Sequence, residues 1–198
     1  MKKTLLLLAI FAAAFATPAH AQSQGGYVGA GALRAYTDNA REFALEFGGT
    51  GADRSRGGMK VYGGYLWRQY GIEAGYYDLG TYGVRVGQAT SDEFETSAFT
   101  LSGVIALPMA PQFTFNAKAG IAFTSVNYRC YVDCGGNFVD TRESNVAGVL
   151  GAGIAWQPAR NFTLRADFEY LGEVTHSAGL LEGLYAYRVF SLSGQINF

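Results

Sequence analysis

The sequence predicts an all-β fold, an eight-stranded antiparallel up-and-down transmembrane β-barrel with short periplasmic turns and long extracellular loops. Three observations support this prediction. Short segments of alternating apolar and polar residues recur along the 198-residue chain, short and long connections alternate between them, and the last segment keeps its alternation up to a terminal phenylalanine. Alternation with a period of two is typical of strands that have one apolar and one polar face.

The N-terminal region is predicted to be a secretory signal peptide. Two lysines precede the apolar run 5–15, and small residues stand just before the cleavage position. We therefore predict a signal peptide at 1–21, cleavage between Ala21 and Gln22, and a single barrel domain at 22–198. The apolar run is shorter than the roughly 20 residues that a transmembrane helix needs. The mature protein is expected to work outside the cytoplasm.

The charge balance excludes one class of partner. Without the two lysines of the signal peptide, the 15 basic residues fall to 13 against 16 acidic residues, a net charge of about −3. Proteins that bind nucleic acid need a basic surface to neutralise phosphates. We therefore expect no nucleic-acid partner.

The predicted strands carry their apolar residues on one parity. In the strand 112–125, for example, Phe113, Phe115 and Ile121 share one face, while Thr114, Asn116 and Lys118 share the other. The predicted strands are roughly 26–36, 58–67, 70–79, 94–107, 112–125, 144–157, 161–171 and 185–198.

The connections between these strands alternate in length. Those at 68–69, 108–111 and 157–160 are short, whereas those at 37–57, 80–93, 126–143 and 172–184 are long and polar. Outer-membrane barrels have short periplasmic turns and longer external loops, and an even strand count returns both termini to one side. Because a bilayer tolerates no open sheet edge, the last strand is expected to pair with the first.

Alternation alone does not say which face meets the lipid, and a secreted, lipocalin-like barrel is the alternative. An eight-stranded barrel has a narrow interior that side chains fill, so turning the bulky apolar face outward relieves crowding. Aromatic residues beside the short turns and the C-terminus also suit a membrane interface; they are Trp67, Phe113, Trp156, Phe162 and Phe198. The residues predicted to face lipid are Tyr27, Leu33, Tyr65, Trp67, Ile72, Tyr76, Phe99, Leu101, Ile105, Phe113, Phe115, Ile121, Trp156, Leu164, Phe168, Phe190, Leu192 and Phe198.

Two stretches resemble a known family. The segment VYGGYLWRQYGIEAGYYDLG, Val61 to Gly80, looks like the second hairpin of small outer-membrane barrels. These are the barrel domain of outer membrane protein A and its relatives, including the adhesion and serum-resistance barrels of enterobacteria. The terminal FSLSGQINF is similar to the closing strand of that family, and the resemblance covers Gly25 to Phe198. Outer membrane protein A also has a periplasmic peptidoglycan-binding domain after its barrel, so peptidoglycan anchoring is not expected here.

The resemblance implies two sets of functional residues. The final aromatic of the closing strand is read by the barrel-assembly machinery, which implies an assembly signal made of Phe190, Leu192, Ile196 and Phe198. A glutamate at the position of Glu73 joins an interior salt-bridge cluster in the family. From strand parity we expect this interior charge cluster to contain Glu73, Lys118, Arg165, Asp167, Glu169, Arg34 and Lys60, the last two nearer the outer mouth. Charges inside a barrel must be paired or hydrated, and the cluster is either a structural plug or a gated ion path.

Cys130 and Cys134 lie close together in the third long loop. Two thiols in an oxidising compartment normally pair, so we predict a disulfide, with free thiols as the alternative. Two cysteines without further ligands do not predict a metal site.

The fourth long loop contains the only histidine of the mature chain, His176, beside Ser177 and near Glu173 and Glu182. A catalytic triad needs a base that a third group orients toward the nucleophile. Adjacent histidine and serine in a glycine-rich loop do not provide this arrangement, so we expect a solvated histidine and no catalytic residues.

The prediction for function is therefore an integral, monomeric protein of the Gram-negative outer membrane. It would act as a structural or surface-interaction scaffold that presents four extracellular loops, with no catalysis, cofactor or metal. The expected partners are outer-membrane lipid and lipopolysaccharide, the barrel-assembly machinery during biogenesis, and a host or surface ligand at the loops. The alternatives are a narrow ion or small-solute channel gated by the interior cluster and a lipid A-modifying enzyme.

Overall fold

The computed structural model describes residues 24–37, 51–52, 55–86, 89–130, 140–172 and 186–198. At 51–52, 82–86, 89–94, 128–130 and 140–143 the description is limited to the backbone. The predicted signal peptide and its cleavage position lie outside the described residues.

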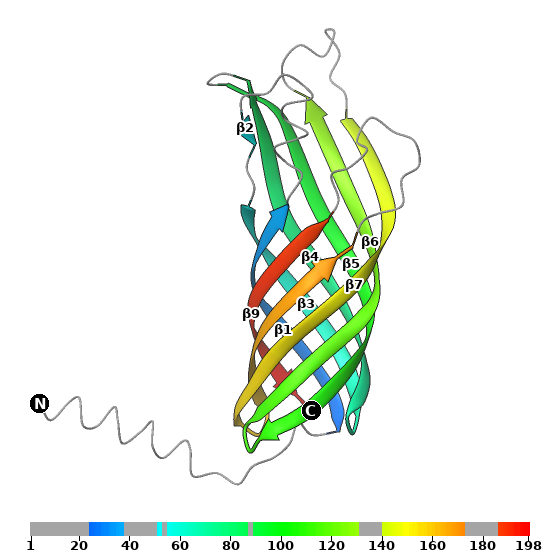
Figure 1. Cartoon of the computed structure of the whole chain (residues 1–198), viewed down its shortest axis with the longest axis vertical. Helices are drawn as coiled ribbons and strands as arrows, with labels where there is room; N and C mark the ends of the chain where they lie inside the picture. The colour runs from blue at the N-terminus through cyan, green and yellow to red at the C-terminus, as the bar shows by residue number, and fades with distance from the viewer. Residues whose placement is uncertain (1–23, 38–50, 53–54, 87–88, 131–139, 173–185) are drawn as a thin grey trace, which may run out of the picture.

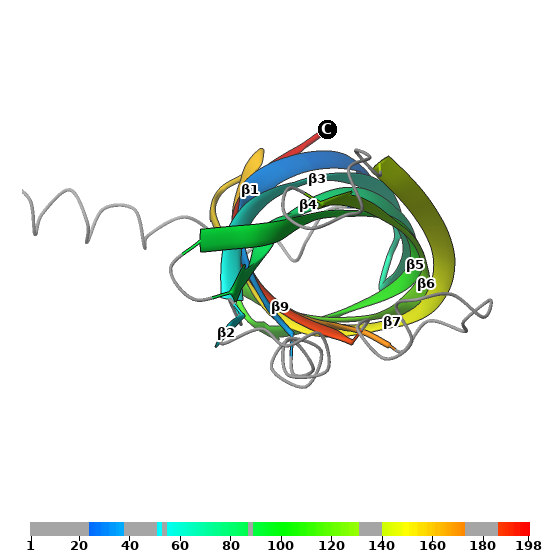
Figure 2. The same cartoon turned by 90° about the horizontal axis from the view of Figure 1, so that it is seen from above.

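The described residues form a closed antiparallel barrel, so the predicted fold class is confirmed (Figures 1 and 2). Eight strands make the wall, each paired with its neighbour, and pairing of β1 with β9 and of β4 with β5 closes the ring. No helix in the described part of the chain is long and apolar enough to cross a bilayer. The barrel strands are β1 (Gly25–Thr37), β3 (Ser55–Trp67), β4 (Tyr70–Val86), β5 (Ala89–Ala110), β6 (Phe113–Cys130), β7 (Asp140–Ala159), β8 (Phe162–Leu171) and β9 (Tyr187–Asn197), and the short β2 (Gly51–Ala52) pairs with β4.

The strands differ greatly in length. The 10 residues of β8 would rise about 25 Å at roughly 3.3 Å per residue and a tilt near 40°, which matches the apolar band of an outer-membrane barrel. The 22 residues of β5 would rise about 55 Å by the same estimate. Strands β4 to β7 therefore continue well beyond the band, as Figure 1 shows.

Two predicted loops contain long stretches of paired strand. Pairing of β4 with β5 continues to Val86 and Ala89, and pairing of β6 with β7 continues to Arg129 and Asp140. The expectation of long loops is therefore wrong over most of 80–93 and at both ends of 126–143. Polar residues suit a strand with water on both faces, and composition alone does not distinguish such a strand from a loop.

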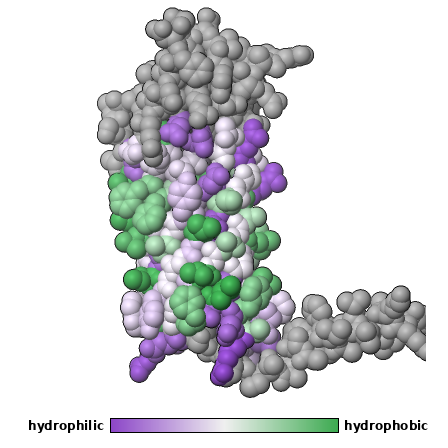
Figure 3. Space-filling view, turned by 180° about the vertical axis from the view of Figure 1, so that it is seen from behind, coloured by the Kyte–Doolittle hydropathy of each residue, from purple (hydrophilic) through white to green (hydrophobic). Residues whose placement is uncertain are grey.

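The outer wall carries the apolar parity. Trp67 is 50% exposed and Phe198 76% exposed, although a soluble protein would bury such side chains. The predicted lipid-facing residues lie on this wall except Tyr27 and Leu33, and the predicted aromatic residues stand beside the turns. On the face seen in Figure 3, a hydrophobic band lies between hydrophilic residues at its two ends.

Strand β1 has the opposite orientation from the one predicted. Tyr27 and Leu33 are buried in the lumen, whereas Arg34 is exposed on the outer wall. The expectation that Arg34 belongs to the interior cluster is therefore wrong, as is the lipid-facing assignment of Tyr27 and Leu33. The cause is local, because β1 has small or apolar residues on both parities and its alternation is weak.

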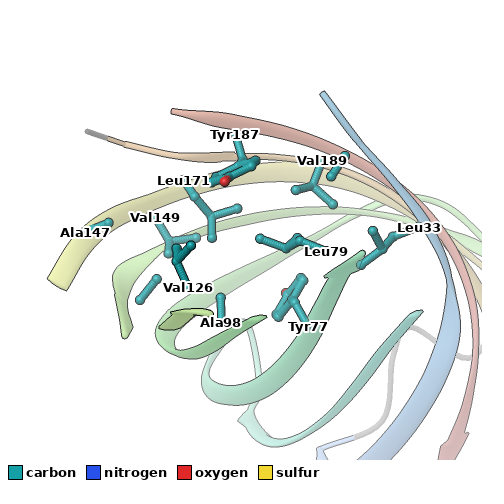
Figure 4. Packing of buried hydrophobic residues seen from close by; sticks show 12 residues of the cluster. Leu33, Tyr77, Leu79, Ala98, Val126, Ala147, Val149, Leu171, Tyr187 and Val189 are labelled. Carbon is teal, nitrogen blue, oxygen red and sulfur yellow. The ribbon is translucent and has the colours of Figure 1, made fainter. Parts of the chain in front are cut away.

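Buried side chains occupy the described part of the lumen in layers of different chemistry. A layer of apolar side chains occupies its extracellular half, where Tyr77, Leu79 and Leu171 meet residues from five other strands (Figure 4). A smaller apolar cluster of Tyr27, Tyr62, Leu66, Val104 and Ala106 lies nearer the periplasmic turns. The charged residues lie between these two clusters.

Candidate functional site in the barrel lumen

Six charged side chains form a closed ring of alternating sign inside the barrel. Glu73 pairs with Lys118 at 3.0 Å, and Lys118 also pairs with Glu169. Lys60 pairs with Glu169 at 3.6 Å and with Asp167 at 2.8 Å. Arg165 closes the ring, with Asp167 at 3.2 Å and Glu73 at 2.7 Å. We call these six residues the ionic ring.

The barrel places these charges together from four strands. Lys60 lies on β3, Glu73 on β4 and Lys118 on β6, while the other three residues alternate along β8. On β8, residues two positions apart point to the same face, so Arg165, Asp167 and Glu169 all enter the lumen. The ring thus links strands across the barrel as well as along the wall.

Burial makes this pairing obligatory. Each member of the ionic ring is at most 8% exposed. Three positive and three negative charges give the ring no net charge. A buried charge without its partner is strongly destabilising, whereas a complete buried pair contributes little net stability. The ring therefore acts as a requirement for correct assembly more than as a source of stability.

Aromatic and amide side chains complete the shell around the ring. The hydroxyl of Tyr27 donates to Glu73 at 3.0 Å, and that of Tyr77 donates to Glu169 at 3.0 Å. The guanidinium of Arg165 lies 4.8 Å from the ring centre of Tyr62 and donates to Gln195 at 3.2 Å. Such contacts stabilise the buried cations.

The sequence interpretation missed these neighbours. Tyr62 and Tyr77 share the parity of Lys60 and Glu73, and Gln195 lies on the polar parity of β9. Parity alone would have placed all three in the lumen. Tyr27 was not predictable in the same way because β1 has weak alternation.

Some buried polar atoms of the lumen have no hydrogen-bond partner. Both side-chain atoms of the Asn116 amide and the hydroxyl of Ser102 are in this state. Ser102 lies directly across from Glu73 in the β4–β5 register but does not contact its carboxylate. These groups contribute polarity to the lumen without joining the ionic ring.

Other predicted sites lie elsewhere. The predicted assembly-signal residues Phe190, Leu192, Ile196 and Phe198 are exposed on the outer wall, and the amide of Phe198 donates to Gly26 at 3.0 Å. Cys130 ends β6, but Cys134 lies outside the described residues, so the disulfide stays a prediction. His176, Ser177, Glu173 and Glu182 also lie outside them.

The outer wall itself has a shallow groove of about 600 Å³. Its lining residues belong to β7, β8 and β9 and are mostly apolar, with Arg165 and Ser193 as the polar members. Such a lining suits hydrocarbon rather than polar ligands.

Comparison with known proteins gives a family match. The family model of the OmpA-like transmembrane domain matches residues 21–188. No curated protein matches the chain.

Several solved outer-membrane barrels have a similar fold. Ail, the attachment invasion locus protein of Yersinia pestis in complex with the heparin analogue sucrose octasulfate, shares 14% identity at a TM-score of 0.55, over 89% of this chain and 100% of Ail. Neisserial surface protein A shares 17% identity at a TM-score of 0.59, over 88% and 97%. OprG from Pseudomonas aeruginosa shares 10% identity at a TM-score of 0.58, over 89% and 97%. At such identities the similarity concerns the fold.

Proposed function

Because the chain belongs to the OmpA-like transmembrane domain family of outer-membrane barrels, we propose that it is a closed scaffold that holds its extracellular part above the membrane. It carries out no catalysis, and it is not a channel. The observation that carries this proposal is that buried side chains occupy the lumen at two chemically different levels. The ionic ring lies between the two apolar clusters, and the apolar layer occupies the extracellular half.

The two levels oppose ion passage by different physical means. The ionic ring would have to break its pairs to admit an ion, which leaves buried charges without partners. The polar groups in the apolar layer are hydroxyls, and those of Tyr77 and Tyr187 already have hydrogen-bond partners. The layer therefore offers little to replace the hydration shell of an ion, and it opposes ion passage even when the ring is open. A barrel gated by the ring alone would conduct after one pair is broken, whereas this barrel would stay closed.

Strands β4 to β7 support the surface role. Their continuation beyond the apolar band supplies a rigid platform for interactions outside the cell, and function in such folds lies mostly on the parts that a rigid scaffold presents. The structure of Ail with a heparin analogue suggests sulfated glycans as a first class of ligand to examine.

Conductance across planar bilayers tests the closed scaffold. We expect the refolded mature barrel to be silent, and the Glu73→Ala variant to be silent as well because the apolar layer remains. Cold and boiled gel electrophoresis verifies that each sample is folded. Stable single-channel steps from the wild-type barrel, or steps that appear in Glu73→Ala, would support the channel instead.

Replacing residues 82–94 with a tight turn tests the surface role. The shortened barrel should keep its place in the outer-membrane fraction and its heat-dependent mobility, since the apolar band is intact. Calorimetry with sucrose octasulfate then compares it with the full barrel. Binding that is unchanged by the replacement would argue against presentation by this hairpin.

A further inference from the structure

The charged side chains at the periplasmic end of the barrel are all basic. The turn segments 67–70, 108–113 and 157–162 contain Arg68 and Arg160 but no aspartate or glutamate, and the adjoining segments 22–26 and 195–198 contain no charged side chain. The C-terminal carboxylate belongs to Phe198, which lies against Gly25 on the β1 side of β9. An anion at the β7–β8 turn would therefore meet an arginine with no acidic side chain in the same turn.

Arg160 stands in the tight turn between β7 and β8, and two hydrogen bonds fix this turn. The side-chain amide of Gln157 donates to the carbonyl oxygen of Arg160 at 2.9 Å. The carbonyl oxygen of Asn161 accepts from the backbone amide of Asn197 at 3.0 Å. The guanidinium itself is exposed, and it has no hydrogen bond or ion pair with the residues that the structure describes. Since a guanidinium has five N–H donors, Arg160 can offer paired donors to an anion.

The apolar groove of the outer wall begins close to this turn. Trp156 of β7 and Leu164 of β8 are paired and both line it, and the lining continues to Ala166. Strand β8 begins at Phe162, four residues before Ala166, and four residues of a strand tilted near 40° rise about 10 Å. The apolar band of an outer-membrane barrel is about 25 Å tall, so the groove lies in its periplasmic half.

The groove reaches the backbone of the wall. Arg165 and Ser193 line it although their side chains are buried on the lumen side. Their outward-facing neighbours Ala166 and Gly194 have the smallest side chains of the lining. A hydrocarbon chain can therefore approach β8 and β9 more closely here than beside the larger apolar residues around the groove, and it gains dispersion contacts along its length.

We propose that Arg160 and this groove together bind an anionic phospholipid of the periplasmic leaflet. The guanidinium pairs with the phosphate through two N–H donors, and one acyl chain lies in the groove. Trp156 stands between these two parts, since its indole N–H donates to Gln112 at 3.3 Å and its side chain lines the groove. An indole suits the boundary between headgroups and hydrocarbon. The site requires only that the barrel is embedded in the membrane, so it does not depend on the scaffold proposal.

Charge favours a lipid over a second copy of the chain as the occupant. A second barrel on this face would bring its own periplasmic end, with arginines and no acidic side chain, to the level of Arg160. An anionic phospholipid has a negative phosphate at that level and hydrocarbon along the groove. A zwitterionic phospholipid also carries a cation in its headgroup, so Arg160 should produce a preference for lipids with a net negative charge.

Quenching of Trp156 fluorescence by brominated lipid measures occupancy of the groove. The full mature barrel with Trp67→Phe keeps Trp156 as its remaining tryptophan. It is reconstituted in phosphatidylcholine bilayers that contain a small fraction of phosphatidylglycerol brominated in its acyl chains. The association constant from the quenching curve should exceed that of brominated phosphatidylcholine. From the usual contribution of one basic residue near anionic lipid, Arg160→Gln should lower it about fivefold, and Arg160→Lys should retain most of it.

Two matched pairs of substitutions separate the site from general effects. Arg68→Gln removes the same charge from the opposite side of the barrel, because two strands separate the β3–β4 turn from the β7–β8 turn in either direction, and it should leave the constant unchanged. Ala166→Leu occupies the groove, so the acyl chain no longer holds the headgroup beside Arg160, and the preference for phosphatidylglycerol should fall. Ala152→Leu faces outward on β7 outside the lining and should have no effect. Heat-dependent mobility shows that each variant is folded before it is compared.

Three results would overturn the proposal. The first is equal quenching of Trp156 by brominated phosphatidylglycerol and brominated phosphatidylcholine in the barrel with Arg160 intact. The second is an equal loss in Arg68→Gln, which would mark a general effect of charge at the periplasmic end. The third is an unchanged preference in Ala166→Leu, which would leave a headgroup contact without a groove.

Discussion

Glu73 is the residue on which the ionic ring most depends. Its carboxylate accepts from Tyr27 at 3.0 Å, from Lys118 at 3.0 Å and from Arg165 at 2.7 Å. Without this charge, the buried cations Lys118 and Arg165 each lose one of their two acidic partners. A single residue on β4 therefore controls contacts to β1, β6 and β8.

We expect Glu73→Gln to lower the free energy of unfolding by about 3–5 kcal/mol, because it leaves an uncompensated buried charge. Urea-induced unfolding in detergent micelles measures this loss. Ser102→Ala is the matched control, since Ser102 lies across from Glu73, is equally buried and has a hydroxyl without a partner. Its stability should change by less than about 1 kcal/mol. Equal effects of the two substitutions would show that the ring does not require Glu73.

Strand β7 approaches the ionic ring closely because it carries glycine at two lumen-facing positions. Gly151 faces the space between Lys118 and Glu169, and Gly153 lies against Asp167. A side chain at either position would occupy the volume that the charged groups use. The glycines of β7 therefore make room for a ring contributed by other strands.

Substitution on β7 tests this close approach. The added Cβ of Gly153→Ala would overlap a carboxylate oxygen of Asp167 and lie 2.7 Å from the carbonyl oxygen of Ala166. We expect a loss of about 2–3 kcal/mol in the free energy of unfolding from overpacking. Gly148→Ala on the same strand meets nothing within 4 Å and should be neutral. If both variants unfold at the same urea concentration as wild type, the lumen is less tightly packed than described.

Strand parity allows the lumen-facing residues of the site to be predicted from the sequence. All six members of the ionic ring lie at positions that strand parity assigns to the lumen. What parity does not reveal is which charge meets which, because that depends on the register between strands far apart in sequence. Lys60 and Asp167, for example, are 107 residues apart.

Strand β1 shows where this reasoning fails. Its inward face holds Tyr27, Leu33 and Ala35, and its outward face holds Val28 and Arg34. Neither face is clearly the apolar one. The inward apolar residues join the two apolar clusters of the lumen, which the sequence interpretation did not expect inside a membrane barrel.

At the scale of the whole molecule, the family resemblance and the eight-stranded barrel predicted from the sequence are confirmed. The height of the barrel was not predictable. Polar segments on either side of 87–88 and 131–139 continue as paired strands, and composition alone does not distinguish a strand with water on both faces from a loop. The result is a barrel with a low side at β8, β9, β1 and β3 and a high side at β4 to β7 (Figure 1).

The proposed closed scaffold depends on one physical premise, which is that the largely apolar outer wall faces hydrocarbon and the ionic ring faces the lumen. A barrel with the opposite sidedness would not support it.

Tryptophan fluorescence quenching tests that premise most directly. The chain has 2 tryptophans, and both Trp67 and Trp156 lie on the outer wall beside the periplasmic turns. In bilayers of brominated phosphatidylcholine we expect strong quenching, greatest when bromine is near the headgroup end of the acyl chain, and little quenching by iodide in the water. Strong quenching by iodide with none by brominated lipid would contradict the account.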